Sequence, residues 1–572
     1  MIYGVLIIQI LFLRMNALVD NNVLPDSFIV LMKESLCLEA VTALVARVGR
    51  EERLTSIRVN PFKMGGNITV DSVLYGLDSC NSNLSGESIN CSGNCNSSAV
   101  KWSKDSFYLV ERPKFTLDPL FHAGAYYVQE ASSMYMNVVG EAIESIVPEF
   151  FSNELRALDL CAAPGGKSTH LSTLLNDNSI LVANEVIKNR SVILADNIAK
   201  WGRGNVVVTN NDPQDFSSLE EVFHLVVVDA PCSGEGMFTK DIAVVDEWSL
   251  DNVNLCSLRQ QRILSDVWSA LKPGGFIVYS TCTYNHFEND DNVKFIVEEL
   301  GAEVVSLDEF VKFGGIKTNM GGVQFVPGLV EGEGQFVALL RKSGCEESDS
   351  LFLDSDSFGV ESVGKEGKKR CSKSESKRIN LVENKRVNSK DKNRGSYSES
   401  KAFRGDVSFS DRASRGDRLN RGDIRGGGSS SLKNLPTIEG LVIEQKGEFL
   451  KGYPAHLERG IKFFESKLKI VLSGIAIANI KGKDFAPHAD FALWQGVREM
   501  LQSESELPMG IVAWEVSREQ AIDFLAKEPL VFSDAPIGYL MLVYKGAPLG
   551  FVKNLGNRTN SLLPMARRIR NK

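Results

Sequence analysis

Two cysteines stand where predicted strands of the sequence end, and they are the residues best placed to do covalent chemistry. Cys232 lies in the segment DAPCSGEG that begins at Asp229, and Cys282 lies in the segment YSTCTY that begins at Tyr279. A thiolate is a strong nucleophile at neutral pH and can attack an electron-poor carbon atom. A single cysteine is more often a small buried hydrophobic residue. Two cysteines after neighbouring strands of one sheet indicate a reactive pair facing a common cleft.

A loop of small residues at positions 161–167, CAAPGGK, supplies a candidate binding site for a negatively charged group. The apolar run before it predicts a buried parallel strand, and leucines at 171, 174 and 175 predict a helix after it. Small residues let a ligand approach the backbone, and the first turn of the helix offers free N–H groups. The glycine spacing matches neither a phosphate-binding P-loop nor the G-x-G-x-x-G dinucleotide pattern.

Three acidic residues, Glu185, Asp212 and Asp229, each follow a predicted strand. Glu185 lies roughly twenty residues beyond the small-residue loop, where a carboxylate meets the ribose hydroxyls in nucleotide-binding sheets. One such acid is often only a loop residue. Three of them in register beside the loop predict a nucleoside-like cofactor.

The strand and helix signals alternate from residue 155 onward. We expect strands near 179–184, 205–209, 222–230, 275–282 and 335–340, and helices near 191–200, 253–271 and 292–300. Nearly continuous apolar strands that alternate with helices are typical of an α/β fold with a doubly wound, mainly parallel sheet. Ligands of such sheets bind at the carboxyl ends of the strands.

The chain of 572 residues is too long for one hydrophobic core. We expect a small N-terminal α/β accessory domain at 15–110 with a disordered loop at 78–98, a central domain at 111–342, a linker at 343–432 and a second folded unit at 433–572. The loop is rich in Asn, Ser and Gly, and the linker in Ser, Lys, Arg, Asp and Gly, without periodicity.

The formal net charge of −8 argues against binding of nucleic acid, but the distribution of the charge along the chain does not. Residues 365–425 carry 19 Lys and Arg against 9 Asp and Glu, a local charge of +10. Such a stretch can attract phosphate even on an acidic protein. It is compatible with a solvated spacer and with transient RNA contact.

The ten cysteines do not form the dense pattern of a disulfide scaffold, which favours the reducing cytoplasm. Cys91 and Cys95 lack the His or Cys partners of a zinc site, and the six histidines do not cluster, so we expect no metal. The apolar run at 1–13 is too short to span a bilayer and lacks the basic start of a signal peptide. We therefore expect no membrane association, and we expect the native chain to begin at Met15.

The segments CAAPGGK, DAPCSGEGMF and STCTY, in this order, resemble the Nop/Sun family of RNA cytosine-C5 methyltransferases, which use S-adenosylmethionine. The resemblance extends to residues 56–63, 122–134 and 332–342. Residues 481–488 and 548–558 resemble the PUA-like RNA-binding unit of the bacterial RsmF group, which acts on small-subunit ribosomal RNA. The resemblance implies a Rossmann-like S-adenosylmethionine methyltransferase domain, an N-terminal RNA-binding domain and a C-terminal PUA-like α+β domain.

The resemblance also implies residue roles. Cys282 would be the nucleophile that bonds to cytosine C6, Cys232 would help to release the product, and Asp229 would orient the base. After Pro327 the family often has a histidine and a basic residue, whereas Gly328 and Leu329 follow here, which puts a target contact at that point in doubt. The residues implied to bind S-adenosylmethionine are Cys161, Ala162, Ala163, Pro164, Gly165, Gly166, Lys167, Glu185, Asp212 and Asp229.

The resulting prediction is a monomeric cytoplasmic enzyme that forms 5-methylcytosine in small-subunit ribosomal RNA. Its partner would be ribosomal RNA or the small ribosomal subunit. Transfer RNA is an alternative substrate, and a non-catalytic RNA-binding or ribosome assembly factor is an alternative of another class. Paired strand-end thiols argue against the latter, because a binding module does not need them. We expect no DNA substrate, because nothing in the sequence indicates recognition of DNA bases.

Overall fold

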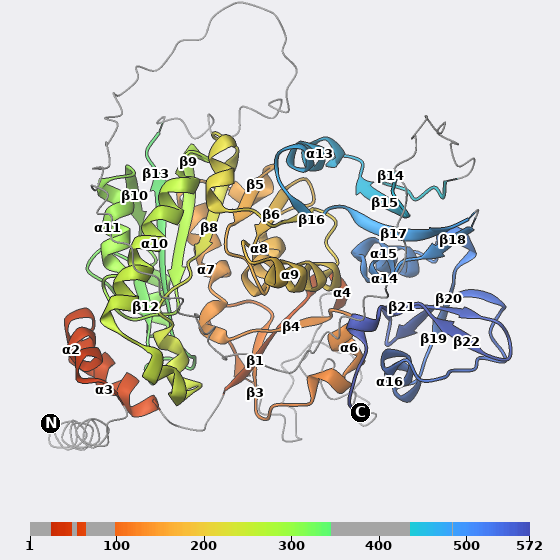
Figure 1. The fold of residues 1–572 in the computed structure, drawn as a ribbon, viewed down its shortest axis with the longest axis horizontal. Coiled ribbons are helices and arrows are strands. Elements are labelled where there is room, and N and C mark those ends of the chain that lie inside the picture. Colours follow the sequence, from red (N-terminus) through yellow and green to blue (C-terminus); the bar gives the residue numbers. More distant parts are fainter. Residues whose placement is uncertain (1–23, 49–53, 65–97, 345–434, 483) are drawn as a thin grey trace, which may run out of the picture. The chain divides into compact units, whose positions relative to one another are not determined.

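The computed structural model describes residues 24–48, 54–64, 98–344, 435–482 and 484–572 (Figure 1). The run at 1–13 and the expected start at Met15 lie outside these residues. The predicted loop at 78–98 and linker at 343–432 also lie outside them, apart from Ser98, Ser343 and Gly344. Among the helices of the described ranges, none is long and apolar enough to cross a membrane.

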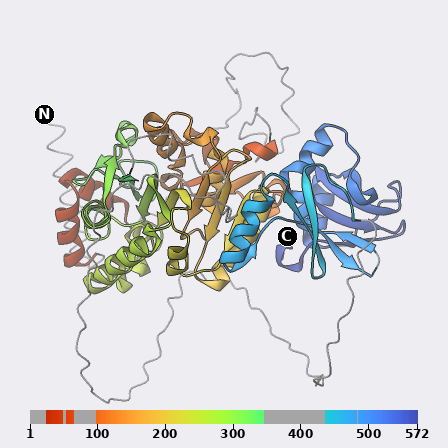
Figure 2. The ribbon, with the colours of Figure 1, turned by 90° about the horizontal axis from the view of Figure 1, so that it is seen from above.

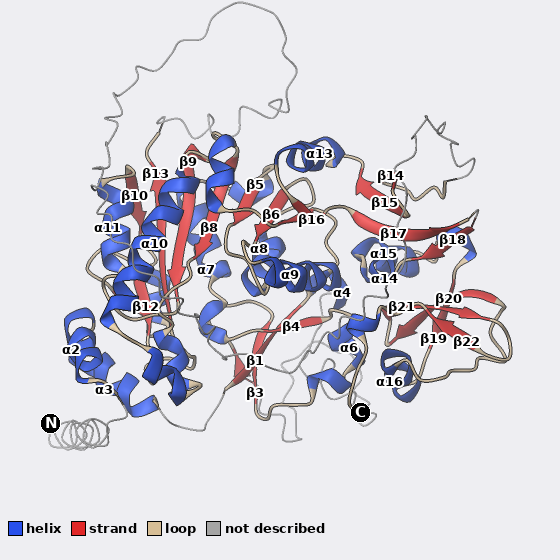
Figure 3. Cartoon of the chain, in the orientation of Figure 1, coloured by secondary structure: helices blue, strands red, loops and turns tan. Residues whose placement is uncertain are grey.

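A ten-stranded sheet forms the centre of the fold, in the order β11-β12-β13-β9-β8-β5-β6-β7-β16, with β10 paired to β13 (Figures 1 and 3). Neighbours among β7, β6, β5, β8 and β9 are parallel. The pairs β9–β13, β10–β13, β12–β13, β11–β12 and β7–β16 are antiparallel. This confirms the prediction of a doubly wound α/β fold, but not of a mainly parallel sheet, because four of these nine strand pairs are parallel and five are antiparallel. The strands are β5 (Arg156–Asp159), β6 (Ile180–Asn184), β7 (Val206–Thr209), β8 (Phe223–Asp229), β9 (Leu271–Thr281), β10 (Ala302–Val305), β11 (Ile316–Lys317), β12 (Val323–Phe325), β13 (Gln335–Lys342) and β16 (Ile470–Leu472).

Helices cover both faces of this sheet, because the apolar strands bury side chains on both sides. On β8, for example, Val227 belongs to one core cluster, and Val226 and Val228 belong to the other. The first cluster contains residues of α7 (Met136–Ile146), α8 (Gly166–Leu174) and α9 (Lys188–Trp201). The second contains residues of α10 (Leu250–Trp268), α11 (Asp290–Glu298) and α13 (Glu458–Lys467). The continuous apolar runs therefore reflect burial on two faces.

Local sequence signals set the ends of these helices. Ser249 caps α10 by accepting a hydrogen bond from the backbone N–H of Asn252. Gly202 ends α9 in the left-handed conformation, with φ of 89°, where a side chain at this position would meet the backbone carbonyl of Leu493. The remaining short helices of residues 111–344 are α6 (Pro119–His122) and α12 (Asp308–Lys312).

The described N-terminal part contains three α-helices and a small antiparallel sheet in the order β2-β3-β1-β4. Its β4 lies beyond the boundary that the sequence placed at 110/111, and Ser98, predicted within a disordered loop, is in β2. The pairing of β4 with β1 therefore extends this small sheet to Val128. The elements are α2 (Asp26–Ser35), α3 (Leu38–Arg47), β1 (Thr55–Val59), α4 (Pro61–Met64), β2 (Ser98–Ala99), β3 (Ser106–Leu109) and β4 (Tyr126–Val128).

The residues from 435 onward form two four-stranded sheets with helices, in the orders β14-β15-β17-β18 and β19-β20-β21-β22 (Figure 2). Their β16 instead joins the central sheet through β7, which the sequence did not predict. The other elements are β14 (Leu441–Lys446), β15 (Phe449–Pro454), β17 (Ile475–Lys481), β18 (Asp484–Pro487), α14 (Ala489–Leu493), α15 (Gln495–Gln502), β19 (Val512–Glu515), α16 (Arg518–Ala526), β20 (Gly538–Tyr544), β21 (Ala547–Asn554) and β22 (Thr559–Ser561).

Candidate active site

A cleft of about 420 Å³ lies at the carboxyl ends of the parallel strands, where ligands of doubly wound sheets bind. Seven residues singled out from the sequence line it, and they come from the ends of five strands. Four further predicted loop residues, Ala162, Pro164, Gly165 and Gly166, do not line the cleft, and neither does Lys167. The lining residues that were predicted are Cys161, Ala163, Glu185, Asp212, Asp229, Cys232 and Cys282.

The loop at 161–167 joins β5 to α8 and is held from outside the cleft. The carbonyl of Pro164 accepts hydrogen bonds from Asn197 at 2.8 Å and from the Tyr127 hydroxyl at 3.2 Å. Gly165 precedes α8 with φ of 113°, and a Cβ atom there would lie 3.2 Å from the Leu194 side chain. Glycine is therefore required at this position for both conformation and space.

Two of the strand-end acids are anchored by residues close in sequence. The buried Glu185 accepts a hydrogen bond from the Ile187 N–H at 2.8 Å, and its other oxygen lies 3.3 Å from Arg190. Asp212 accepts the N–H of Gln214, and its second oxygen lies 3.5 Å from Arg262 of α10. Both carboxylates thus keep a fixed orientation at the rim of the cleft.

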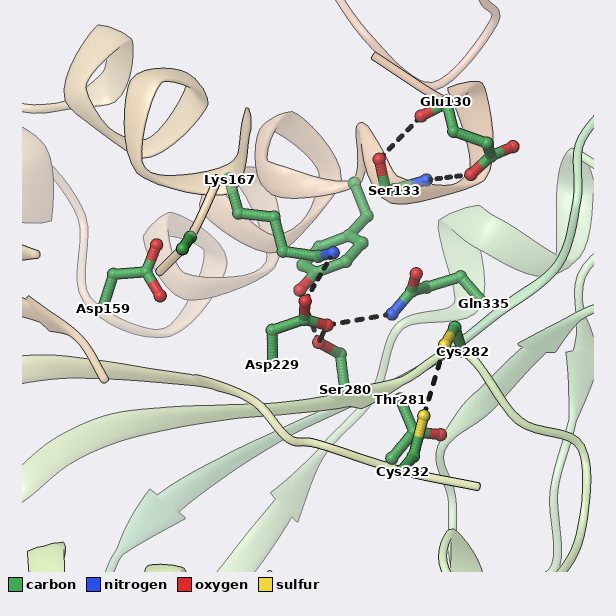
Figure 4. A network of polar contacts seen from close by, with 12 residues as sticks. Glu130, Ser133, Asp159, Lys167, Asp229, Cys232, Ser280, Thr281, Cys282 and Gln335 are labelled. Carbon is green, nitrogen blue, oxygen red and sulfur yellow. Dashed lines mark hydrogen bonds and ion pairs between the residues drawn. The ribbon is translucent and has the colours of Figure 1, made fainter. Parts of the chain in front are cut away.

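Asp229, the last residue of β8, is the centre of a polar network (Figure 4). One carboxylate oxygen lies 2.9 Å from the Lys167 ammonium. The other accepts hydrogen bonds from Ser280 at 2.8 Å and from Gln335 at 3.3 Å. Burial alone would lower the pKa of Lys167, but the Asp229 charge and hydrogen bond together raise it. Lys167 therefore stays charged and neutralises Asp229, although it does not line the cleft.

The two thiols lie together, with the sulfur atoms of Cys232 and Cys282 3.2 Å apart (Figure 4). The hydrogen bond from Cys232 lowers the pKa of Cys282, against the effects of burial and Asp229, and the charges of Lys167 and Lys240 lower it further. The same hydrogen bond, followed by burial, raises the pKa of Cys232. These opposite shifts favour Cys282 as the thiol of the pair that loses its proton first, with Cys232 as the hydrogen-bond donor.

Cys161, the third thiol of the cleft, has a different environment. Burial, followed by the nearby charges of Asp159 and Asp229, raises its pKa, so it remains a neutral thiol. Of the three cysteines, only Cys282 has the properties of a nucleophile. No group of His, Cys, Asp and Glu within the described ranges could hold a metal ion.

Sequence reasoning missed several residues of the cleft, including Arg259 and Arg262 of α10 and Arg190 of α9. Their helices show an apolar period for the buried face, but a pattern cannot tell which polar residue of the other face borders a cleft. Gln335 was also missed, because its contact with Asp229 depends on the antiparallel pairing of β13 with β9.

The lining fits S-adenosylmethionine by its chemistry. The acids at the ends of β6 and β7 suit hydroxyl and amino donors of a nucleoside, and the small residues Cys161 and Ala163 leave space beside them. The cleft volume lies within the roughly 300–1,000 Å³ of small-molecule sites.

Three family models match this chain. Residues 150–341 match the 16S rRNA methyltransferase RsmB/F model, residues 80–131 match the N-terminal domain of 16S rRNA methyltransferase RsmF, and residues 512–569 match the methyltransferase RsmF PUA domain. Residues 150–341 are therefore similar to the methyltransferase domain of the RsmB/F family. The N-terminal match extends past residue 110, in agreement with the position of β4.

Two similar proteins are identical to the chain at about a third of the aligned positions. Ribosomal RNA small subunit methyltransferase F of Aeromonas salmonicida is 32% identical over 56% of this chain and 65% of its own length. Its namesake from Pectobacterium atrosepticum is 35% identical over 43% of this chain and 51% of its own length. The chain thus spans less than two thirds of either relative. A methyltransferase homolog from Pyrococcus horikoshii is 26% identical, with a TM-score of 0.42 over 54% of this chain and 92% of that one.

Proposed function

We propose that the chain is an S-adenosylmethionine-dependent RNA methyltransferase that forms 5-methylcytosine in small-subunit ribosomal RNA. The observation that carries this proposal is the close pair of Cys282 and Cys232 in one cleft with the small-residue loop and three strand-end acids. The names of the relatives and the match to an RsmF PUA domain support RNA as the substrate.

The first step is attack of the Cys282 thiolate on C6 of an unstacked cytosine. The new sulfur–carbon bond breaks the C5–C6 double bond, and the electron pair makes C5 a nucleophile. The bound cofactor supplies an electrophilic methyl group to C5. Asp229, fixed by Lys167, Ser280 and Gln335, is placed to accept a hydrogen bond from the N3/N4 edge of the base.

The last step is removal of the C5 proton and loss of Cys282 from C6, which restores the double bond and the thiolate. Cys232 is the group to assist it, since it lies 3.2 Å from Cys282. The main cause of its raised pKa is the hydrogen bond to Cys282, and that cause disappears once Cys282 is bonded to carbon. The pKa of Cys232 then falls, so Cys232 can lose its proton to solvent and accept the C5 proton as the base, or as a thiol it can position another base.

Two substitutions test these roles. Cys282→Ala should abolish methyl transfer while cofactor binding survives. Cys232→Ala should accumulate a protein–RNA adduct that persists on denaturing gels. Cys256→Ala is the matched control, because Cys256 is buried on α10 outside the lining of the cleft. Transfer by Cys282→Ala, or free turnover by Cys232→Ala, would contradict the assignment.

The substrate is tested separately by bisulfite sequencing of ribosomal and transfer RNA from a deletion strain. Loss of a modified cytosine from small-subunit ribosomal RNA is the expected result, and loss from transfer RNA alone would overturn the ribosomal assignment. We further propose a monomeric cytoplasmic enzyme with a catalytic domain near 111–342 and RNA-binding domains at 15–110 and 433–572. The match of an RsmF PUA model to 512–569 supports the last of these.

A further inference from the structure

The two loops that carry the cysteines exchange buried carboxylates. Glu235, three residues after Cys232, accepts the backbone N–H groups of Tyr284 at 2.8 Å and Asn285 at 3.1 Å, just beyond Cys282. Glu288, six residues after Cys282, accepts the N–H of Ser233 at 2.9 Å, just beyond Cys232. Each loop thus holds the backbone beside the cysteine of the other loop.

Asn285 joins the two carboxylates. Its side-chain amide nitrogen lies 2.9 Å from an oxygen of Glu235 and 2.9 Å from an oxygen of Glu288. Its amide oxygen accepts the backbone N–H of Glu288 at 3.0 Å. All three side chains are completely buried. One amide therefore fixes the separation of two negative groups that would otherwise repel each other.

The other hydrogen bonds of these carboxylates come from neutral groups. Trp248 donates to Glu235 at 3.1 Å, and Gln260 donates to Glu288 at 2.8 Å. Burial raises the pKa of Glu235, although its hydrogen bonds oppose this. Every oxygen of the two carboxylates accepts at least one hydrogen bond, which offsets the cost of burying them and fixes their orientation.

The loops also touch directly. The N–H of Gly236 donates to the carbonyl of Cys282 at 2.8 Å, and a Cβ atom on Gly236 would lie 2.8 Å from that same oxygen. Residue 236 must therefore be glycine for the backbones to approach this closely. Together with the carboxylate contacts, this leaves little freedom in the position of Cys282 relative to Cys232.

We propose that Glu235, Glu288 and Asn285 are positioning residues that hold Cys232 within hydrogen-bonding distance of Cys282 and so keep Cys282 in its reactive form. The proposal deepens the proposed function, on which its catalytic consequence rests. Its geometric content does not need RNA or a methyl donor, because the reactivity of a thiol can be measured directly.

The test is the rate of alkylation of Cys282 by iodoacetamide as a function of pH, followed by mass spectrometry of the peptide that contains it. In Asn285→Ala the bridging amide is gone, the carboxylates separate, and Cys282 loses its hydrogen bond from Cys232. We expect the midpoint of the profile to rise by about one pH unit, with a roughly tenfold slower reaction at pH values well below the wild-type midpoint and an unchanged rate at high pH.

Two further variants complete the design. Asn205→Ala is the matched control, since Asn205 is a buried amide that donates to the carbonyl of Ser179 at 2.9 Å before the start of β6. It should lower the melting temperature without moving the Cys282 midpoint. Glu288→Gln keeps the shape of the side chain but can place an amide NH2 group against donors such as the Ser233 N–H and the Gln260 amide. It should therefore move the midpoint in the same direction as Asn285→Ala.

The outcomes separate the proposals. An unchanged midpoint in a folded Asn285→Ala would overturn the positioning role, and if that variant does not fold, Glu288→Gln decides in the same way. If Asn285→Ala shifts the midpoint but the wild-type protein transfers no methyl group to RNA, only the proposed function is overturned. If both proposals hold, Asn285→Ala should lose kcat at pH 7 by the same factor as the alkylation rate, with little change in KM for RNA.

Discussion

Replacement of Asp159 by asparagine should stabilise the protein at alkaline pH. Asp159 ends β5 and is fully buried. One of its oxygens accepts a hydrogen bond from Ser168 at 2.6 Å, and the other has no hydrogen-bond partner in the described structure. Burial, together with the charge of Asp229 and against the bond from Ser168, raises the pKa of Asp159 from 3.8 to about 7. Ionisation of this residue therefore opposes folding.

The magnitude follows from linkage. A carboxyl group whose pKa is raised in the folded state contributes stability below the unfolded pKa and loses it as the pH rises through the folded value. A rise in pKa of about three units corresponds to a loss of roughly 4 kcal/mol in the free energy of unfolding. About two of these units lie above pH 5, and they correspond to roughly 2–3 kcal/mol. Asparagine has the same shape, cannot ionise, and keeps an oxygen for Ser168. Between pH 5 and pH 8, the free energy of unfolding of Asp159→Asn should therefore rise by that amount relative to the wild type.

The assay is urea denaturation of both proteins at pH 5, 6, 7 and 8, with Glu141→Gln as the control for loss of an exposed carboxylate. The control should show no difference that depends on pH. The reasoning would be refuted if the advantage of Asp159→Asn were constant over this range, or if it decreased as the pH rose.

Two further substitutions probe the surroundings of the cleft. Lys167→Met removes a charge that lowers the pKa of Cys282. The ratio of the Cys282 alkylation rate in the variant to that in the wild type should therefore be lowest below pH 7 and recover at high pH. A ratio independent of pH would contradict this. Arg58→Lys removes a buried guanidinium that donates to Gly166 and Thr169 and lies 4.6 Å from the centre of the Trp201 ring. It should cost about 2–4 kcal/mol, measured as a lower melting temperature, and an unchanged temperature would exclude a role for these bonds.

The catalytic cleft was largely predictable, because its residues follow strands whose apolar runs are unmistakable. Every strand predicted between residues 179 and 340 exists, with ends that differ by up to four residues. Parallel strands bring their carboxyl ends to one edge, so Glu185, Asp212 and Asp229 had to converge if the strands were neighbours. The resemblance of the motifs to a known family then gave chemical meaning to Cys232 and Cys282.

The contacts that could not be predicted are those made between distant segments. Glu235 and Asn285 lie in polar loops that look exposed in the sequence, yet both are completely buried, because each satisfies the other. Strand β16 has only three residues, too few for a pattern, and its partner β7 lies more than 250 residues earlier. A three-residue strand is defined by its neighbour rather than by its own propensity.

The pairing of β16 with β7 has a consequence for biosynthesis. Ribosomes add about 5–20 residues per second, so β7 emerges on the order of tens of seconds before its edge partner has been made. During that interval the nascent sheet ends in an apolar strand with unsatisfied backbone groups, the kind of edge that recruits other chains. Residues 470–472 satisfy that edge only when they pair with β7 late in synthesis. A product that terminates before them should aggregate, even though every residue of the cleft is present.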